Sequence, residues 1–284
     1  MSGAACIFIT AAASLLVYAP ACEAMARVRQ SSELGSLHSS LHLEGEEALE
    51  AMREEAVQYN RTVRSEQRKR SFSYRGEEAS DSTYTHVMDP EGSGVMAELL
   101  IPSLGIDLPV VHGTRAEDLE YRCGHMYGTS VPVGGVSSHA VIAGHTGLVT
   151  AELFTRLTDL KKGEVFLVRV LGETHVYEIK NIRVVLPEDE SPFLNVVEGR
   201  DLITLYTCTP YGINDHRLLV TGERHFPDLD DEHSGGGMIS SEHMNVRYGV
   251  LAALWIAVPV MIPVVFVWLD RREKHMKRAG GIRT

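Results

Sequence analysis

Residues 95–227 alternate short apolar or β-branched segments with turns, and this pattern limits the possible folds more than any other feature. The segments have the length and composition of strands, and Gly-, Pro- and Asp-containing turns separate them. The expected strands are Val95–Ile101, Ile106–Val111, Ala140–Ala143, Val165–Val170, His175–Val185, Leu202–Thr207 and Leu218–Thr221. So many short strands at close spacing predict a mostly β fold, either a small closed barrel or a sandwich.

Composition and charge exclude several classes of protein. The chain has 284 residues, of which 44% are hydrophobic and 23% charged, as in folded proteins and unlike disordered ones. This length accommodates one substantial domain with appendages. The net charge of −11 at pH 7 argues against nucleic acid as the main partner, because phosphate binding needs a basic surface.

A polar region precedes the expected strands. Within it, apolar residues recur at helical spacing over Glu46–Val63, which predicts an amphipathic helix that packs against a domain. The polar stretch Ser65–Ser82 follows, and Gly92–Gly94 predicts a flexible joint before the first strand. We therefore assign residues 27–94 to an N-terminal helical region that ends in a loop.

Two uncharged segments are candidates for contact with membrane lipid. Residues 248–269 are long enough to cross the hydrocarbon core, and a basic tail at residues 270–284 follows them. This pattern predicts a transmembrane helix after a linker at residues 228–247, with the tail in the cytoplasm and the middle of the chain outside the cell. Residues 1–26 fit either a cleaved signal peptide or a signal anchor that stays in place.

A cysteine and an arginine are expected to meet at one edge of the sheet. Cys208 ends one apolar run, Arg217 begins the next, and turn residues lie between them. Antiparallel pairing of these two strands brings a thiol and a guanidinium together. Since a nearby cation stabilises the reactive thiolate, Cys208 is a candidate nucleophile.

A histidine is expected to join this pair. An apolar strand ends in the segment Gly144–Gly147, which places the His145 ring at a sheet edge. Cysteine and histidine together supply a nucleophile with a general acid and base, and arginine supplies donors for a carbonyl oxygen or oxyanion. Of the other cysteines, Cys6 and Cys22 fall in or beside the apolar N-terminus, and Cys123 is expected to be a small buried residue.

These residues lie in motifs that resemble a known family. The segments Leu205–Gly212 and His216–Val220 resemble the active-site signature of class C sortases, the pilus-assembling transpeptidases of Gram-positive bacteria. Further segments match class C patterns in the same order along the chain: His112–Thr114, Gly128–Gly135, Gly144–Leu148, Phe154–Leu157, Lys161–Glu164 and Leu171–Thr174. The resemblance implies a closed sortase-type β-barrel with short helices, preceded by the amphipathic helix and flanked by membrane segments.

The resemblance also implies a reaction. Cys208 would attack the Thr–Gly bond of an LPxTG-like sorting signal on a pilin precursor, with His145 as general acid and base and Arg217 stabilising the carbonyl or oxyanion. A pilin lysine would then resolve the thioacyl intermediate and form an isopeptide link, with no metal or organic cofactor. Thr207 and Thr209 flank the nucleophile and are candidate substrate-binding residues, with strand propensity as the alternative explanation.

Class C sortases carry a lid loop before the first barrel strand, in which an Asp-Pro-aromatic tripeptide covers the active site. By resemblance, Asp89 and Pro90 would form this lid, and Asp89 would pair with Arg217. Glu91 stands where the family usually has a ring, so such a lid would be held mainly by charge. The alternative is that Asp89 and Pro90 only initiate a turn.

Two other functions remain open at this point. An anchoring transpeptidase would use the amine of a cell-wall peptide in place of a pilin lysine, and an inactive surface protein would bind sorting signals without cleaving them. The joint presence of Cys208, His145 and Arg217 argues against the inactive protein. The C-terminal apolar segment and the lid-like segment favour pilus assembly over anchoring.

Overall fold

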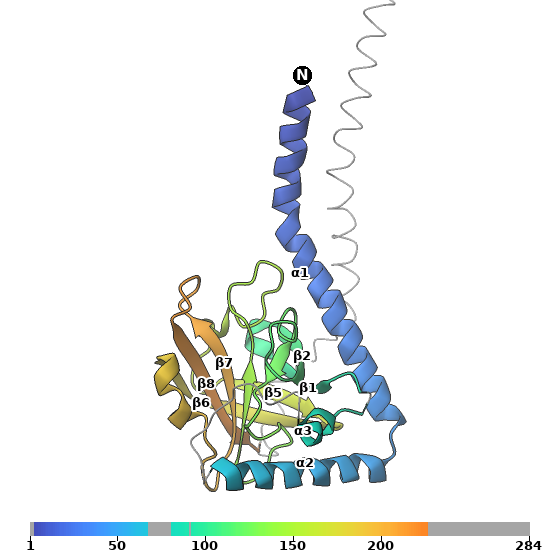
Figure 1. Ribbon diagram of the computed structural model, residues 1–284, viewed down its shortest axis with the longest axis vertical. Helices are drawn as coiled ribbons and strands as arrows, with labels where there is room; N and C mark the ends of the chain where they lie inside the picture. The colour runs from blue at the N-terminus through green and yellow to red at the C-terminus, as the bar shows by residue number, and fades with distance from the viewer. Residues whose placement is uncertain (1–2, 68–80, 91, 227–284) are drawn as a thin grey trace, which may run out of the picture. The chain divides into compact units, whose positions relative to one another are not determined.

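Eight strands close into a barrel with the order β1-β2-β3-β4-β7-β8-β6-β5 (Figure 1). The computed structural model describes residues 3–67, 81–90 and 92–226, and only the backbone of residues 3–13. The strands are β1 (Val95–Ile101), β2 (Ile106–His112), β3 (Cys123–His125), β4 (Ser138–Ala143), β5 (Val165–Val170), β6 (Glu173–Val185), β7 (Asp201–Thr209) and β8 (His216–His225). The closed barrel confirms the mostly β prediction and decides between barrel and sandwich.

The strand pairing is mixed. The pairs β2–β3 and β4–β7 are parallel, whereas the other neighbouring pairs in the barrel are antiparallel. Every strand expected from the sequence is present, and β1 and β5 have the predicted bounds. The sequence pattern missed β3, because its 3 residues are too few to show an alternating pattern.

Helices occupy the N-terminal region and the connections. They are α1 (Gly3–Leu43), α2 (Glu46–Gln67) and α3 (Ser82–His86), with 3₁₀ turns η2 (Pro102–Leu104), η3 (Leu157–Asp159), η4 (Pro187–Asp189) and η5 (Ser191–Phe193). The helix α2 confirms the predicted amphipathic helix and crosses one end of the barrel beside α3 (Figure 1). The Asn60 side chain exchanges two hydrogen bonds with the Val131 backbone, at 3.0 and 2.7 Å, which anchors α2 to the barrel.

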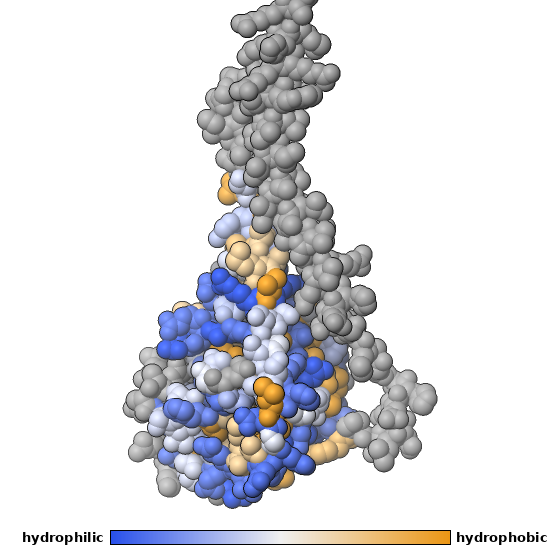
Figure 2. Space-filling view, turned by 90° about the vertical axis from the view of Figure 1, so that its right-hand side faces the viewer, coloured by the Kyte–Doolittle hydropathy of each residue, from blue (hydrophilic) through white to orange (hydrophobic). Residues whose placement is uncertain are grey.

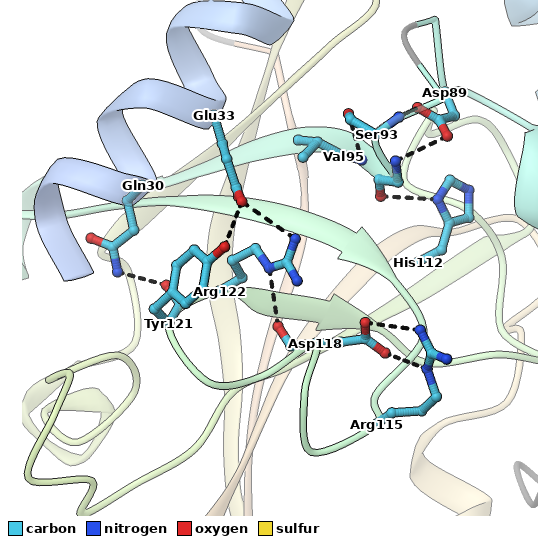
Figure 3. Close-up of polar contacts among 11 residues, drawn as sticks. Gln30, Glu33, Asp89, Ser93, Val95, His112, Arg115, Asp118, Tyr121 and Arg122 are labelled. Atoms are coloured by element: carbon cyan, nitrogen blue, oxygen red, sulfur yellow. Dashed lines mark hydrogen bonds and ion pairs between the residues drawn. The ribbon is translucent and has the colours of Figure 1, made fainter. Parts of the chain in front are cut away.

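The helix α1 continues well beyond the apolar N-terminal segment. Its residues from Arg29 onward belong to the same compact unit as the barrel, and those up to Val28 belong to another. Within the barrel unit, the Tyr121 hydroxyl donates to Glu33 at 2.7 Å and the Tyr121 carbonyl accepts from Gln30 at 2.7 Å (Figure 3). These bonds tie the second half of α1 to the loop between β2 and β3.

The predicted membrane segments stay predictions from the sequence. In the described part of the chain, no helix combines the length and the apolar character needed to cross a membrane. The predicted linker at residues 228–247, transmembrane segment at residues 248–269 and tail at residues 270–284 lie outside the described residues.

Large apolar side chains fill the barrel. Phe166 stacks on Tyr177 with ring centroids 5.6 Å apart, and both rings are fully buried, as are Leu205 and Val220. Burial of each such side chain stabilises the fold by about 1.5–3 kcal/mol. The packed interior therefore holds the strand ends, and the side chains on them, in fixed positions.

On the face that Figure 2 presents, hydrophilic residues predominate on the described surface and hydrophobic residues appear as separate spots.

Candidate active site

The two strands that contain the predicted motif are paired as expected, and they place Cys208 opposite Arg217. β7 and β8 are antiparallel, and Cys208 and Arg217 are direct partners in their register. Side chains at opposed positions point to the same face, with Cβ atoms about 4.5–5.5 Å apart. Cys208 is a free thiol and is partly exposed. The thiol and the guanidinium therefore share one face of the sheet.

His145 reaches the same end of the sheet from β4. β4 runs parallel to β7 with Ala143 opposite Tyr206, and the next amide, that of Gly144, donates to the Tyr206 carbonyl at 3.1 Å. Two residues beyond this pair, the two segments carry His145 and Cys208. Since neighbouring strands lie about 4.8 Å apart, this register places the backbone of His145 next to that of Cys208. The three residues thus sit at one end of three adjacent segments.

The segment that carries His145 is fixed by its neighbours. The Thr207 hydroxyl donates to the Gly144 carbonyl at 2.7 Å, and the His145 carbonyl accepts from the Phe154 amide at 3.1 Å. A Cβ on Gly144 would lie 2.8 Å from the buried Phe154 ring, so only glycine fits there. These contacts set where the imidazole leaves the backbone.

The two threonines that flank Cys208 are both buried. Thr207 is buried, and its hydroxyl bonds to Gly144 and so supports the segment that carries His145. As a strand neighbour of Cys208, it points to the opposite face of the sheet. Thr209 is also buried and shares the face of Thr207, since side chains two residues apart on a strand point the same way. The Thr207 hydroxyl is therefore already bonded within the protein. Substrate contacts of Thr207 and Thr209 stay predictions.

Burial and neighbouring groups shift the pKa values of His145 and Arg217. Partial burial lowers the pKa of His145 below its usual value, so the ring is neutral near pH 7 and able to accept a proton. Burial alone would lower the pKa of Arg217, but the neighbouring Tyr206 and Cys208 groups outweigh it and raise the pKa. Arg217 therefore remains a cation, and it lies opposite Cys208 in the strand register.

Arg217 is held by contacts that the sequence motifs did not indicate. Its Nε donates to the Tyr206 hydroxyl at 2.8 Å, and its Nη1 donates to the carbonyls of Asn214 and His216, each at 3.1 Å. The Tyr206 hydroxyl in turn donates to the Glu190 carboxylate at 2.9 Å. Tyr206 could have been found from its position two residues before Cys208, whereas nothing in the sequence pattern links Glu190 to this site.

The predicted lid residues occupy a turn before β1. Asp89 accepts the Ser93 and Gly94 amides, one on each carboxylate oxygen and each at 3.0 Å, while the Gly94 carbonyl contacts the His112 ring at 3.0 Å (Figure 3). The preceding Met88 is fully buried.

These contacts replace the predicted ion pair between Asp89 and Arg217, which is absent among the described residues. The carboxylate is satisfied by amides a few residues away, and the guanidinium has its own partners. The structure supports the alternative in which Asp89 and Pro90 form a turn. Glu91 lies outside the described residues.

Buried Cys123 has the place that its sequence context predicted. The residue is fully buried in β3, and burial raises the pKa of its thiol well above the usual value. A protonated, inaccessible thiol is a poor nucleophile. Of the two barrel cysteines, only Cys208 is open to chemistry.

Comparison with known proteins points to one family. The family model of the sortase domain matches residues 99–225. The solved structure of sortase C-1 from Actinomyces oris is 46% identical, covers 64% of this chain and 99% of that chain, and superposes with a TM-score of 0.58. Sortase C from Streptococcus pneumoniae is 32% identical, with 69% of this chain and 97% of that chain covered and a TM-score of 0.61.

A curated relative adds a more distant match. Sortase D of Bacillus subtilis (strain 168) is 28% identical over 138 residues, which make up 48% of this chain and 66% of that relative. The chain thus spans just under two thirds of the length of this relative. Identity of 46% over nearly the whole of the Actinomyces structure is well above the level at which only a fold is shared. The chain belongs to the sortase family of cysteine transpeptidases, with class C sortases among its structural neighbours.

Proposed function

We propose that this sortase cleaves an LPxTG-like sorting signal between Thr and Gly and transfers the acyl group to a lysine of a pilin subunit. The observation that carries the proposal is the register that sets Cys208 opposite Arg217 and beside the end of β4 with His145. The choice of pilin as substrate is supported by the class C neighbours, one of which, from Streptococcus pneumoniae, is described in terms of pilin substrate specificity.

The first half of the reaction forms a thioester. Neutral His145 takes the proton of the Cys208 thiol, and the sulfur attacks the carbonyl carbon of the threonine. Negative charge develops on the carbonyl oxygen, where the Arg217 guanidinium donates hydrogen bonds. The C–N bond then breaks, and His145 returns the proton to the departing glycine amine.

The second half forms the isopeptide bond. The side-chain amine of the acceptor lysine attacks the thioester carbonyl and gives a proton to His145. Arg217 stabilises the oxyanion again, the C–S bond breaks, and the proton restores the Cys208 thiol. One turnover links two subunits, and repetition extends the polymer.

The proposal includes a place for the enzyme at the cell membrane. Its support is the uncharged segment at residues 248–269 and the basic tail at residues 270–284, both known here from sequence alone. This arrangement keeps the barrel on the outer side of the membrane, where pilin precursors with sorting signals emerge. We expect the purified protein to partition into the detergent phase. Deletion of residues 248–284 should abolish this partitioning.

One experiment tests the proposed function. The full-length enzyme is incubated with a pilin that carries an LPxTG-like signal and an acceptor lysine, and the products are separated under denaturing conditions. We expect isopeptide-linked multimers with the wild type and none with Cys208→Ala. Cleavage without multimers, together with transfer to a cell-wall peptide amine, would assign the chain to the anchoring class instead. Binding of the signal with no cleavage would reduce it to a binding protein.

A further inference from the structure

We propose that Tyr206 and Glu190 form a relay that fixes the Arg217 guanidinium for oxyanion stabilisation. Both are positioning residues, because they act through Arg217 and do not touch the reacting atoms. The inference rests on the proposed function of this site and adds two residues to it. Neither residue belongs to the predicted set of Cys208, His145 and Arg217.

The relay is a directed chain of hydrogen bonds. Arg217 Nε donates to the Tyr206 hydroxyl at 2.8 Å, and that hydroxyl donates to Glu190 Oε2 at 2.9 Å. A phenol has one proton, so donation to Glu190 leaves its lone pairs for Arg217. The carboxylate thereby sets the direction in which the hydroxyl accepts.

The strand register places this relay on the correct face of the sheet. Tyr206 lies two residues before Cys208 on β7, and both side chains point to the same face. Their partners on β8, Leu219 and Arg217, share that face as well. Arg217 is therefore held from one side by Tyr206, along the same strand that carries the nucleophile.

Glu190 lies on a packed part of the connection between β6 and β7. The residue is only 2% exposed, although it is a carboxylate in a loop. Nearby Leu194 is fully buried in an apolar cluster against which Tyr206 packs. The Asn195 carbonyl contacts the His139 ring at 2.8 Å. A buried carboxylate on a packed segment holds its partner in one orientation.

The contacts of Arg217 leave one nitrogen for the substrate. Its Nε binds Tyr206, and its Nη1 binds the carbonyls of Asn214 and His216. Across the described residues, Nη2 makes no hydrogen bond that would compete with a substrate oxygen. Because the guanidinium is planar, fixing Nε and Nη1 also fixes the direction of the Nη2 hydrogens.

Tyr206→Phe is the variant that tests the relay, because it removes both hydrogen bonds and keeps the ring in the apolar cluster. We expect kcat to fall about 10- to 100-fold with KM within about two-fold, as for a lost hydrogen bond to a charged group used in the transition state. Tyr177→Phe is the matched control. Its hydroxyl also donates to a carboxylate, that of Asp201 at 3.1 Å, at the opposite end of β7 from Cys208.

The control variant should keep the wild-type kcat, since its lost bond affects only folding. NMR without substrate measures how fast the Arg217 Nε–H proton exchanges with solvent. We expect slow exchange in the wild type and in Tyr177→Phe, and fast exchange in Tyr206→Phe. Glu190→Gln keeps an acceptor oxygen and should lose less activity than Glu190→Ala.

Two results would overturn the relay. One is a wild-type kcat and a protected Nε–H in Tyr206→Phe. The other is an equal fall of kcat in Tyr177→Phe, which would show a general loss of stability. A wild-type enzyme that cleaves no sorting peptide, but whose Nε–H exchange responds as expected, would contradict the proposed function and leave the relay in place. The two failures are therefore distinguishable.

Discussion

Arg217 and Cys208 are direct partners in the antiparallel ladder of β8 and β7. The cation to which we assign stabilisation of the reacting group thus belongs to the sheet and not to a loop. A slip of one residue in this register would turn one of the two side chains to the other face of the barrel. The hydrogen bonds of the ladder therefore hold the pairing of Cys208 and Arg217 as well as the fold.

Thr207→Val should disturb the segment that carries His145. The substitution keeps the shape of the side chain but leaves the Gly144 carbonyl without its 2.7 Å partner. A buried acceptor left unpaired costs about 1–3 kcal/mol, and we expect a lower kcat because the His145 ring shifts. Urea unfolding and steady-state kinetics measure the two effects. Thr207→Ser keeps the hydroxyl and should retain most activity; equal kcat in both variants and the wild type would show that the bond plays no part.

Gly144→Ala should harm catalysis more than stability alone explains. Its new Cβ would lie 2.8 Å from the buried ring of Phe154, directly before His145. Gly222→Ala is a matched control, because its Cβ would lie 2.6 Å from Phe166 in a part of the barrel away from the nucleophile. Overpacking of this kind costs about 1–3 kcal/mol at either position. When kcat is calculated per folded enzyme, only Gly144→Ala should lower it. A similar loss of kcat in both variants would show that the effect does not depend on the position next to His145.

Asp89→Ala should leave access to the nucleophile unchanged. The carboxylate accepts the Ser93 and Gly94 amides and makes no ion pair with Arg217 among the described residues. We expect the labelling rate of Cys208 with a thiol reagent to match that of the wild type. The turn should lose about 1 kcal/mol of stability, as for a lost side-chain cap. A clear increase in labelling rate would restore the lid hypothesis for Asp89 and Pro90.

His139 should make folding stability depend on pH. The ring contacts the Asn195 carbonyl and the Thr204 hydroxyl, and burial lowers its pKa to about 4. Above the unfolded pKa of about 6.5 the ring is neutral in both states, so its contribution is constant. As pH falls from 6.5 to 4, only the unfolded chain takes up the proton, and the protein loses about 3 kcal/mol from this group.

The comparison variant for this effect is His139→Gln, which does not titrate. The difference in unfolding free energy between pH 7 and pH 4 should be about 3 kcal/mol larger for the wild type than for the variant. Parallel pH curves for the two proteins would show that His139 is not held neutral in the fold.

The sequence predicted the barrel and the strands that carry Cys208 and Arg217 well, for a physical reason. Strands alternate with a period of two and end at turn residues, so both their positions and the residues at their ends can be read from the pattern. Cys208 and Arg217 flank a single turn, and their pairing follows from antiparallel geometry. The placement of His145 needed the parallel contact between β4 and β7, which no local pattern records.

The sequence predicted side-chain partners less well. Glu190 reaches Tyr206 from between two short 3₁₀ turns, η4 and η5, whose sequence spacing gives no information about the direction of the side chain. The Asp89 prediction was wrong about its partner, because nearby backbone amides satisfy a carboxylate before a distant arginine can. Contacts of this kind depend on how the connections pack on the barrel.

The most direct test of the account is to identify the atom that carries the acyl group. The full-length enzyme is incubated with an LPxTG-like peptide without an acceptor amine, digested, and analysed by mass spectrometry. We predict a thioacyl adduct on the fragment that contains Cys208, retained in Cys123→Ala and absent in Cys208→Ala. An adduct at another residue, or undiminished cleavage by Cys208→Ala, would contradict the assignment of Cys208 as the nucleophile.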